Sequence, residues 1–194
     1  MLKELTFDQI EYFKGKISKP YIFAANENAI QILSSNKVPF IYMEDDARCI
    51  KENYEDILDI PKECDILYLG GTAHSNIHFV SQDPKIKINN ITGIANSRLH
   101  YKHVNDKFLR IFNMFSAHAI LFLTEKGKEE YLKAINTFKN QPFDVTFSMV
   151  MPNLNVYMVK KPFFYQNDGH NDKLSKNIIS EDDIVKSKDV NWQK

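Results

Sequence analysis

The chain has 194 residues and a mass of 22.7 kDa, which is the size of a single domain. Its 25 lysines and arginines balance 25 aspartates and glutamates, so no overall basic field is available to hold nucleic acid or an anionic membrane. Hydrophobic residues make up 43% of the chain, which excludes a disordered protein. The two cysteines, Cys49 and Cys64, form no CxxC pair and are too few for a disulfide framework.

Helix and strand patterns alternate along the first third of the chain. A capping-box spacing predicts a short helix from about Phe7. A strand is expected over residues 20–25, followed by a helix that Asn26 caps and Pro39 limits. Residues 38–43 have the apolar pattern of a strand buried on both faces. No segment has the pattern of a signal peptide or a membrane span, so we expect a cytoplasmic protein.

The alternation continues through the middle of the chain. A helix around residues 54–58 and a buried strand over residues 65–71 are expected next. Residues 72–106 have the polar, irregular pattern of loops and antiparallel edge strands. Residues 117–124 return to the pattern of a core strand, and Thr124 begins a helix. The apolar face of that helix is expected to contain Tyr131, Leu132, Ile135 and Phe138.

The last third supplies two more strand candidates, residues 155–159 and 162–166, before the chain becomes polar. Alternating helices and strands favour a sheet with helices on its faces. We therefore expect one α/β domain over residues 1–172, with a mixed, mostly parallel central sheet. A polar tail is expected over residues 173–194.

The clearest candidate site is the sequence Glu44-Asp45-Asp46, which directly follows the predicted strand 38–43. Burial disfavours like charges at such a place, and a divalent cation is the usual way of offsetting their repulsion. The alternative is an acidic turn or the N-terminus of a helix. A second Glu-Asp-Asp, residues 181–183, has no strand before it and indicates a solvated surface.

Five segments, in this order along the chain, support a more specific interpretation. They are VPFIYMEDDA, DILYLGG, FSAHAILFLTEKGKEEYLKAI, FDVTFS and KPFFYQ. Together they resemble glycosyltransferase family 25, which includes lipooligosaccharide and collagen galactosyltransferases. The resemblance covers about residues 24–166. It implies a GT-A-like fold, with a single Rossmann-like domain that transfers a sugar from a nucleotide-sugar donor, expected to be a UDP-sugar, to an acceptor hydroxyl with inversion.

The resemblance also implies roles for individual residues. Glu44, Asp45 and Asp46 would hold the donor diphosphate through a divalent metal, manganese or magnesium, with Asp46 the most direct ligand and Glu44 beside it. Asp144 would be the base that activates the acceptor hydroxyl. The other assignments place Gly70, Gly71 and His118 at the donor, Gln166 at the acceptor and His170 on the metal.

Several of these residues have a structural alternative. Asp144 could cap a helix instead, since aspartate is a good N-cap. His118, with Ser116 two residues before it, could be a hydrogen-bonded core residue. Gly70 and Gly71 could form an ordinary tight turn rather than let a loop pass close to substrate.

The chain differs from the family at its start. Only 43 residues precede Glu44, and the Asn-Leu-Asp strand with which family members begin is absent. The chain therefore resembles a compact member with a shortened N-terminus, whose donor site is altered, completed by another protomer of a homo-oligomer, or lost. Loss would leave a non-catalytic binding module. Another metal-dependent phosphate-ester enzyme is a third interpretation, although the P-loop, GxSxG and HExxH motifs are absent. The acceptor stays open between a glycan, a protein and a modified nucleobase.

Overall fold

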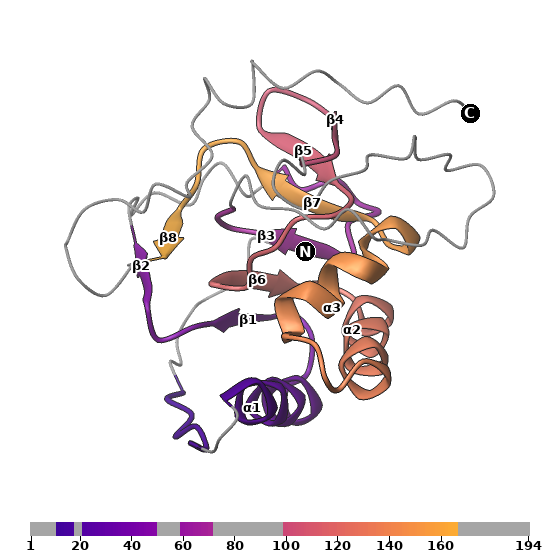
Figure 1. Cartoon of the computed structure of the whole chain (residues 1–194). Coiled ribbons are helices and arrows are strands. Elements are labelled where there is room, and N and C mark those ends of the chain that lie inside the picture. The colour runs from indigo at the N-terminus through magenta and orange to yellow at the C-terminus, as the bar shows by residue number, and fades with distance from the viewer. Residues whose placement is uncertain (1–10, 18–20, 50–58, 72–98, 167–194) are drawn as a thin grey trace.

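A computed structural model describes residues 11–17, 21–49, 59–71 and 99–166. Figure 1 shows a central sheet with three helices, α1, α2 and α3, gathered beside it. The start of the helix predicted from Phe7 lies outside the described residues, and residues 11–17, which are described, are not helical. The helix predicted around residues 54–58, the tail at residues 173–194 and the candidate ligand His170 also lie outside them. Neither Cys49 nor Cys64 takes part in a disulfide within the described residues. Among the described helices, none combines the length and the apolar character that crossing a bilayer requires.

The central sheet has six strands in the order β1-β6-β3-β7-β5-β4. Their bounds are Phe40–Met43 (β1), Ile66–Tyr68 (β3), Tyr101–His103 (β4), Phe108–Ile111 (β5), Ala119–Phe122 (β6) and Val156–Val159 (β7). Within this sheet β3 and β7 pair in parallel, and the other four neighbouring pairs are antiparallel. The prediction of an α/β protein with a mixed sheet is confirmed, whereas the prediction of a mostly parallel sheet is wrong.

Strands β6 and β5 explain this difference, since each runs opposite to both of its neighbours. A run of helix-strand units gives parallel neighbours only when each crossover returns the chain to the same end of the sheet. Strand β6 instead inserts between β1 and β3 and runs opposite to both. Strands β1, β3 and β7 still point in one direction, because β3 is parallel to β7. Their carboxyl ends therefore share one edge of the sheet, called the carboxyl edge below.

Helix α1, Tyr21–Ser35, replaces the strand predicted over residues 20–25. A short apolar run is compatible with either structure, and Ala24, Ala29 and Leu33 are buried at helical spacing. Asn26 lies inside this helix and does not cap it. Its buried side chain donates hydrogen bonds to the carbonyls of Lys139 and Gln141, at 3.0 and 2.9 Å, and so ties α1 to the loop between α2 and α3.

Helices α2 and α3 complete the helical layer. Helix α2, Glu125–Thr137, begins where predicted, because the hydroxyl of Thr124 accepts a hydrogen bond from the amide of Gly127 at 3.1 Å. Phe138 follows the end of this helix and is 41% exposed, so it does not belong to the predicted apolar face. Helix α3 spans Phe143–Val150 and continues into the short 3-10 helix η4, Met151–Asn153.

Hydrophobic clusters cover both faces of the sheet. On one face, side chains of all three helices pack on alternate residues of the strands, with Tyr131 and Phe147 stacked at the centre. On the other face, Phe163 and Phe164 pack with Cys64 against β3 and β6. Phe164 belongs to β8, Phe164–Gln166, which pairs with β2, Ala47–Cys49, in a separate two-stranded sheet. Strands β1, β3, β6, β7 and β8 confirm the strands predicted between residues 38 and 166.

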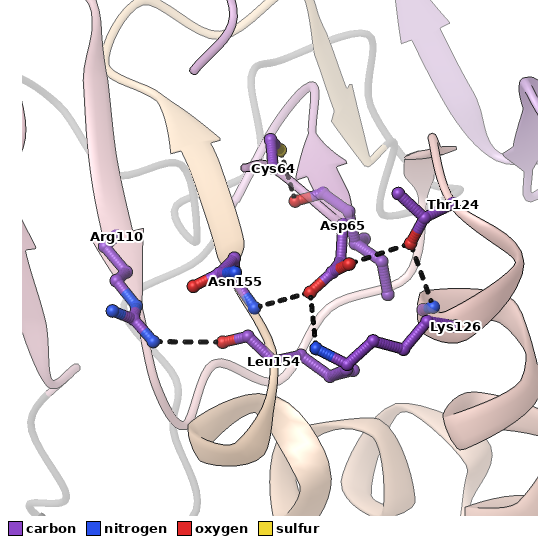
Figure 2. Close-up of polar contacts among 9 residues, drawn as sticks. Cys64, Asp65, Arg110, Thr124, Lys126, Leu154 and Asn155 are labelled. Atoms are coloured by element: carbon purple, nitrogen blue, oxygen red, sulfur yellow. Dashed lines mark hydrogen bonds and ion pairs between the residues drawn. The ribbon is translucent and has the colours of Figure 1, made fainter. Parts of the chain in front are cut away.

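Asp65 joins three elements at the end of β3 opposite the carboxyl edge (Figure 2). One carboxylate oxygen accepts a hydrogen bond from the Thr124 hydroxyl at 2.8 Å. The other accepts from the backbone amide of Asn155 at 3.0 Å and from Lys126 Nζ at 3.3 Å. Asp65 is 5% exposed, whereas the Lys126 side chain is 60% exposed. A single buried carboxylate therefore fixes the start of β3 to the N-terminus of α2 and to the residue before β7.

Candidate functional site

The carboxyl edge brings together residues that are far apart in the sequence. The amide of Glu44, directly after β1, donates to the carbonyl of His118 at 3.1 Å. The amide of Leu69, directly after β3, donates to the carbonyl of Ala119 at 3.0 Å. His118 precedes β6, so it lies between the ends of β1 and β3 because β6 runs against both.

Glu44, Asp45 and Asp46 form a turn rather than the start of a helix. The amide of Ala47 donates to the carbonyl of Glu44 at 3.1 Å, which closes a four-residue turn with the two aspartates at its centre. Asp45 is exposed, whereas Glu44 and Asp46 are half-buried. Aspartate suits such positions, because its short side chain tolerates turn geometry. The acidic turn connects β1 directly to β2.

Arg48 is a residue of this turn region that the sequence analysis missed. Its Nη1 donates to the carbonyls of Asp45 and Ala47, at 2.9 and 3.0 Å. The guanidinium therefore holds the backbone of the acidic turn. The available signal for Arg48 was a basic residue two positions after Asp46. The local pattern did not predict that its side chain would return to the backbone of the turn.

Strand β8 brings Gln166 to the acidic turn. In the antiparallel pairing of β2 with β8, Gln166 lies opposite Ala47 and Tyr165 lies opposite Arg48. The amides of Phe163 and Phe164 also donate to the carbonyl of Leu69, at 2.8 and 3.2 Å. The segment that follows β7 thus crosses the end of β3 and continues to the end of β1.

The carboxylates act on one another electrostatically. Burial, followed by the charges of Asp46, Asp144 and Asp45, raises the pKa of Glu44 to about 8. Burial and the same four carboxylates raise the pKa of Tyr42, the residue two before Glu44 in β1. Helix α3 therefore places Asp144 close enough to the turn for its charge to act on Glu44 and Tyr42. Accumulated negative charge of this kind favours binding of a proton or a cation.

Asp144 occupies the first turn of α3, where Pro142 is the N-cap, so the prediction that Asp144 could be the cap is wrong. One carboxylate oxygen accepts a hydrogen bond from the amide of Val145 at 2.8 Å. Burial raises the pKa of Asp144, and that hydrogen bond opposes the shift. The second oxygen is the atom through which Asp144 could accept a proton.

The ring of His118 is buried, with 1% of the residue exposed. Its Nδ1 lies 2.7 Å from the hydroxyl of Ser116. Burial lowers the pKa of His118. A hydrogen bond with the backbone of Phe164 and the charge of Asp46 act in the opposite direction and raise it. This geometry favours the interpretation of His118 as a hydrogen-bonded core residue, whose carbonyl holds the acidic turn in place.

Gly70 and Gly71 are both buried at the end of β3. A Cβ atom at Gly70 would meet the carbonyl oxygen of Phe164 and Nε2 of His118. A Cβ atom at Gly71 would meet the sulfur atoms of Met114 and Met158. Both glycines therefore permit close packing within the protein, and a contact of either with a donor stays a prediction.

Gly70→Ala is expected to lower the free energy of unfolding by about 2 kcal/mol, because the methyl group would push the Phe164 backbone away from β3. Gly15→Ala is the comparison, since its Cβ would displace only the Asn28 side chain and its two hydrogen bonds to Lys16, away from the sheet. Urea unfolding of both variants measures the effect. If Gly70→Ala is as stable as Gly15→Ala, the backbone at Phe164 can move to accommodate the methyl group without loss of stability.

The raised pKa of Glu44 predicts how stability depends on pH. The pKa of a glutamate in an unfolded chain is ~4.3, whereas folded Glu44 keeps its proton up to about pH 8. Over that interval the folded state binds more protons, so its stability falls as pH rises. The slope is expected to be smaller in Glu44→Gln, as measured by urea unfolding across the same interval. If the stability of the wild type and of Glu44→Gln falls equally with pH, the raised pKa of Glu44 is contradicted.

The residues predicted to bind a metal are partly assembled. Glu44 and Asp46 lie on one turn, and their oxygen donors suit a hard divalent cation. Within the described part of the chain, no three or more His, Cys, Asp and Glu side chains are grouped so that they could hold one ion. The third predicted ligand, His170, lies outside this part.

Comparison of the chain with protein-family models, with curated proteins and with solved structures found no match in any of the three. The geometry of the carboxyl edge is therefore the basis on which a function can be argued.

Proposed function

We propose that the protein is a metal-dependent glycosyltransferase of the family 25 type, with a GT-A-like fold and a nucleotide-sugar donor. The acidic turn carries the proposal, because it places mutually repelling carboxylates at the carboxyl edge of the sheet. Ligands of open α/β sheets bind outside the carboxyl ends of their strands. The common direction of β1, β3 and β7 is compatible with such a site.

In this proposal Glu44 and Asp46 hold a divalent cation, manganese or magnesium, and Asp45 contributes to the negative potential that attracts it. A cation bound there would neutralise the diphosphate of the donor as it leaves. Burial and then the repulsion of neighbouring carboxylates raise the pKa of Glu44, and a bound cation would relieve that repulsion, which favours its binding. Backbone bonds from Arg48 keep the turn in shape.

Asp144 is the proposed base. Its second carboxylate oxygen would take the proton of the acceptor hydroxyl while the new bond to the anomeric carbon forms and the bond to the diphosphate breaks. A carboxylate whose pKa is raised by burial is a better base than an exposed aspartate. Gln166, opposite Ala47 at the edge of the turn, would bind the acceptor through its amide.

Asp144→Asn tests the role of the base. The amide keeps the size of the side chain but cannot accept the proton, so transfer is expected to slow by about 100-fold or more. Affinity for a nucleoside diphosphate with Mn²⁺ should change little. Donor consumption, measured with and without added acceptors, gives the rate. Equal losses of affinity and rate would indicate a structural role for Asp144.

The proposed function as a whole is tested by thermal shift with nucleoside diphosphates and nucleotide sugars, each with and without Mn²⁺ or Mg²⁺. A ligand at 100 times its dissociation constant stabilises a protein by about 2.7 kcal/mol. Stabilisation by one nucleotide class that depends on the metal is the expected result. A folded protein that responds to none of these ligands would contradict the proposal and favour a non-catalytic binding module.

A further inference from the structure

Strand β1 is at one edge of the six-stranded sheet, and its outer side is open within the described part of the chain. The amide of Glu44 points toward β6, where it bonds to His118. Backbone groups alternate in direction along a strand, so Tyr42 also faces β6, whereas Ile41 and Met43 face away from it. Met43 is 44% exposed. An unpaired edge of this kind is a template for pairing with another strand.

An apolar surface lies on the same side of the molecule. It consists of Tyr12, Phe13, Ile17, Tyr21, Ile22 and Phe23, and is called the N-terminal apolar surface below. Tyr12 is 93% exposed, Ile17 is 89% exposed and Tyr21 is 66% exposed. Figure 1 shows α1 and the segment 11–17 at the β1 side of the sheet. Large apolar side chains exposed on neighbouring stretches of the chain are typical of a site of association.

The segment 11–17 is held in place on α1. The side-chain amide of Asn28 bonds to Lys16 in both directions: Oδ1 accepts from the Lys16 amide at 2.9 Å, and Nδ2 donates to the Lys16 carbonyl at 3.3 Å. Lys16 Nζ also pairs with Glu27 at 3.2 Å. The N-terminal apolar surface is therefore a formed surface before any partner binds.

The charges at the two ends of β1 are complementary to each other. Lys37 precedes the strand, is exposed, and forms no ion pair with any described residue. The acidic turn follows the strand. If two copies of β1 pair in antiparallel fashion, their outward groups can meet with Ile41 of one copy opposite Met43 of the other. This arrangement places the basic end of one strand, where Lys37 precedes the bend at Val38 and Pro39, beside the acidic turn of the other copy.

From these observations we infer that the open edge of β1 and the N-terminal apolar surface form an interface with a second copy of the chain. A twofold axis at Tyr42 makes each contact twice, so the strand edge supplies two Ile41–Met43 pairs and brings each Lys37 near the partner's acidic turn. The apolar surface supplies the hydrophobic area that a four-residue strand lacks. The basic and acidic ends of one strand make the surface self-complementary, which favours a copy of the same chain over an unrelated partner.

Sedimentation equilibrium of the whole chain over a range of concentrations tests the inference. The wild-type protein should reach twice the 22.7 kDa mass of one chain. Ile17→Asp and Lys37→Glu should each weaken the dimer by about tenfold or more, the first by loss of apolar burial and the second by repulsion from the acidic turn. Neither side chain is buried, so the thermal midpoint of the monomer should stay unchanged.

Charge reversal on both sides tests the attraction between the two ends of the strand. Lys37→Glu combined with Asp45→Lys should restore the dimer that Lys37→Glu weakens. Lys102→Glu, an equally exposed lysine on the opposite edge strand β4, should have no effect. A monomeric wild-type protein, a dimer that Ile17→Asp and Lys37→Glu leave intact, or a double variant as weak as Lys37→Glu alone would each overturn the inference.

Discussion

Replacing Asp46 with alanine is expected to abolish the stabilisation that a nucleoside diphosphate with Mn²⁺ gives to the wild-type protein. Asp46 is the neighbouring charge that contributes most to the raised pKa of Glu44, so its removal takes away both a proposed metal ligand and much of the negative potential. The same relief of repulsion should leave the protein as stable as the wild type, or more stable, without ligand. Loss of ligand binding without loss of stability is characteristic of a binding residue.

Thermal shift and urea unfolding, performed on the same samples, measure these two effects. Asp106→Ala is the matched control, because Asp106 is an exposed aspartate in the turn between β4 and β5. Its ligand response should equal that of the wild type. If Asp46→Ala keeps a full metal-dependent response, the acidic turn is not the metal site and the proposed function loses its main support.

Replacing Asp65 with alanine is expected to lower the free energy of unfolding by about 3 kcal/mol. The substitution leaves the Thr124 hydroxyl and the Asn155 amide without their acceptor, in a place where the carboxylate is 5% exposed. Each hydrogen bond to a charged group contributes about 1.5 to 3 kcal/mol, and the total is limited by relaxation around the site. Urea unfolding measures the loss.

Lys126→Ala distinguishes the buried hydrogen bonds from the ion pair. Lys126 is 60% exposed, so its pair with Asp65 is screened by solvent and should contribute less than about 1 kcal/mol. A loss in Lys126→Ala as large as that in Asp65→Ala would mean that the charge pair, rather than the backbone and hydroxyl contacts of Figure 2, stabilises this end of the sheet.

The strands and the acidic turn could be predicted because their signals are local. Residues 38–43 and 117–124 have the apolar pattern of strands that are buried in a sheet. The acidic residues directly follow residues 38–43. The strand predicted over residues 20–25 failed because a short apolar run suits a helix equally well. Asn26 was mistaken for a cap because its partners, the carbonyls of Lys139 and Gln141, are distant in sequence.

The arrangement of the site depended on contacts that no local pattern specifies. The pairing of β2 with β8, which brings Gln166 to the acidic turn, joins residues more than a hundred positions apart. The burial of His118 follows from the insertion of β6 between β1 and β3, which also creates two of the four antiparallel pairs of the sheet. The residues proposed for the site could therefore be named from the sequence, whereas Arg48 and the direction of the strands could not.

The position of β6 also has a consequence for synthesis of the chain. Strands β1 and β3 leave the ribosome early but are not neighbours in the sheet, because each pairs with β6, which ends at Phe122. Their backbone groups cannot form these bonds until that residue has emerged. Nascent chains that stop before β6 therefore expose two apolar strands without their shared partner, which is the condition under which incomplete proteins aggregate.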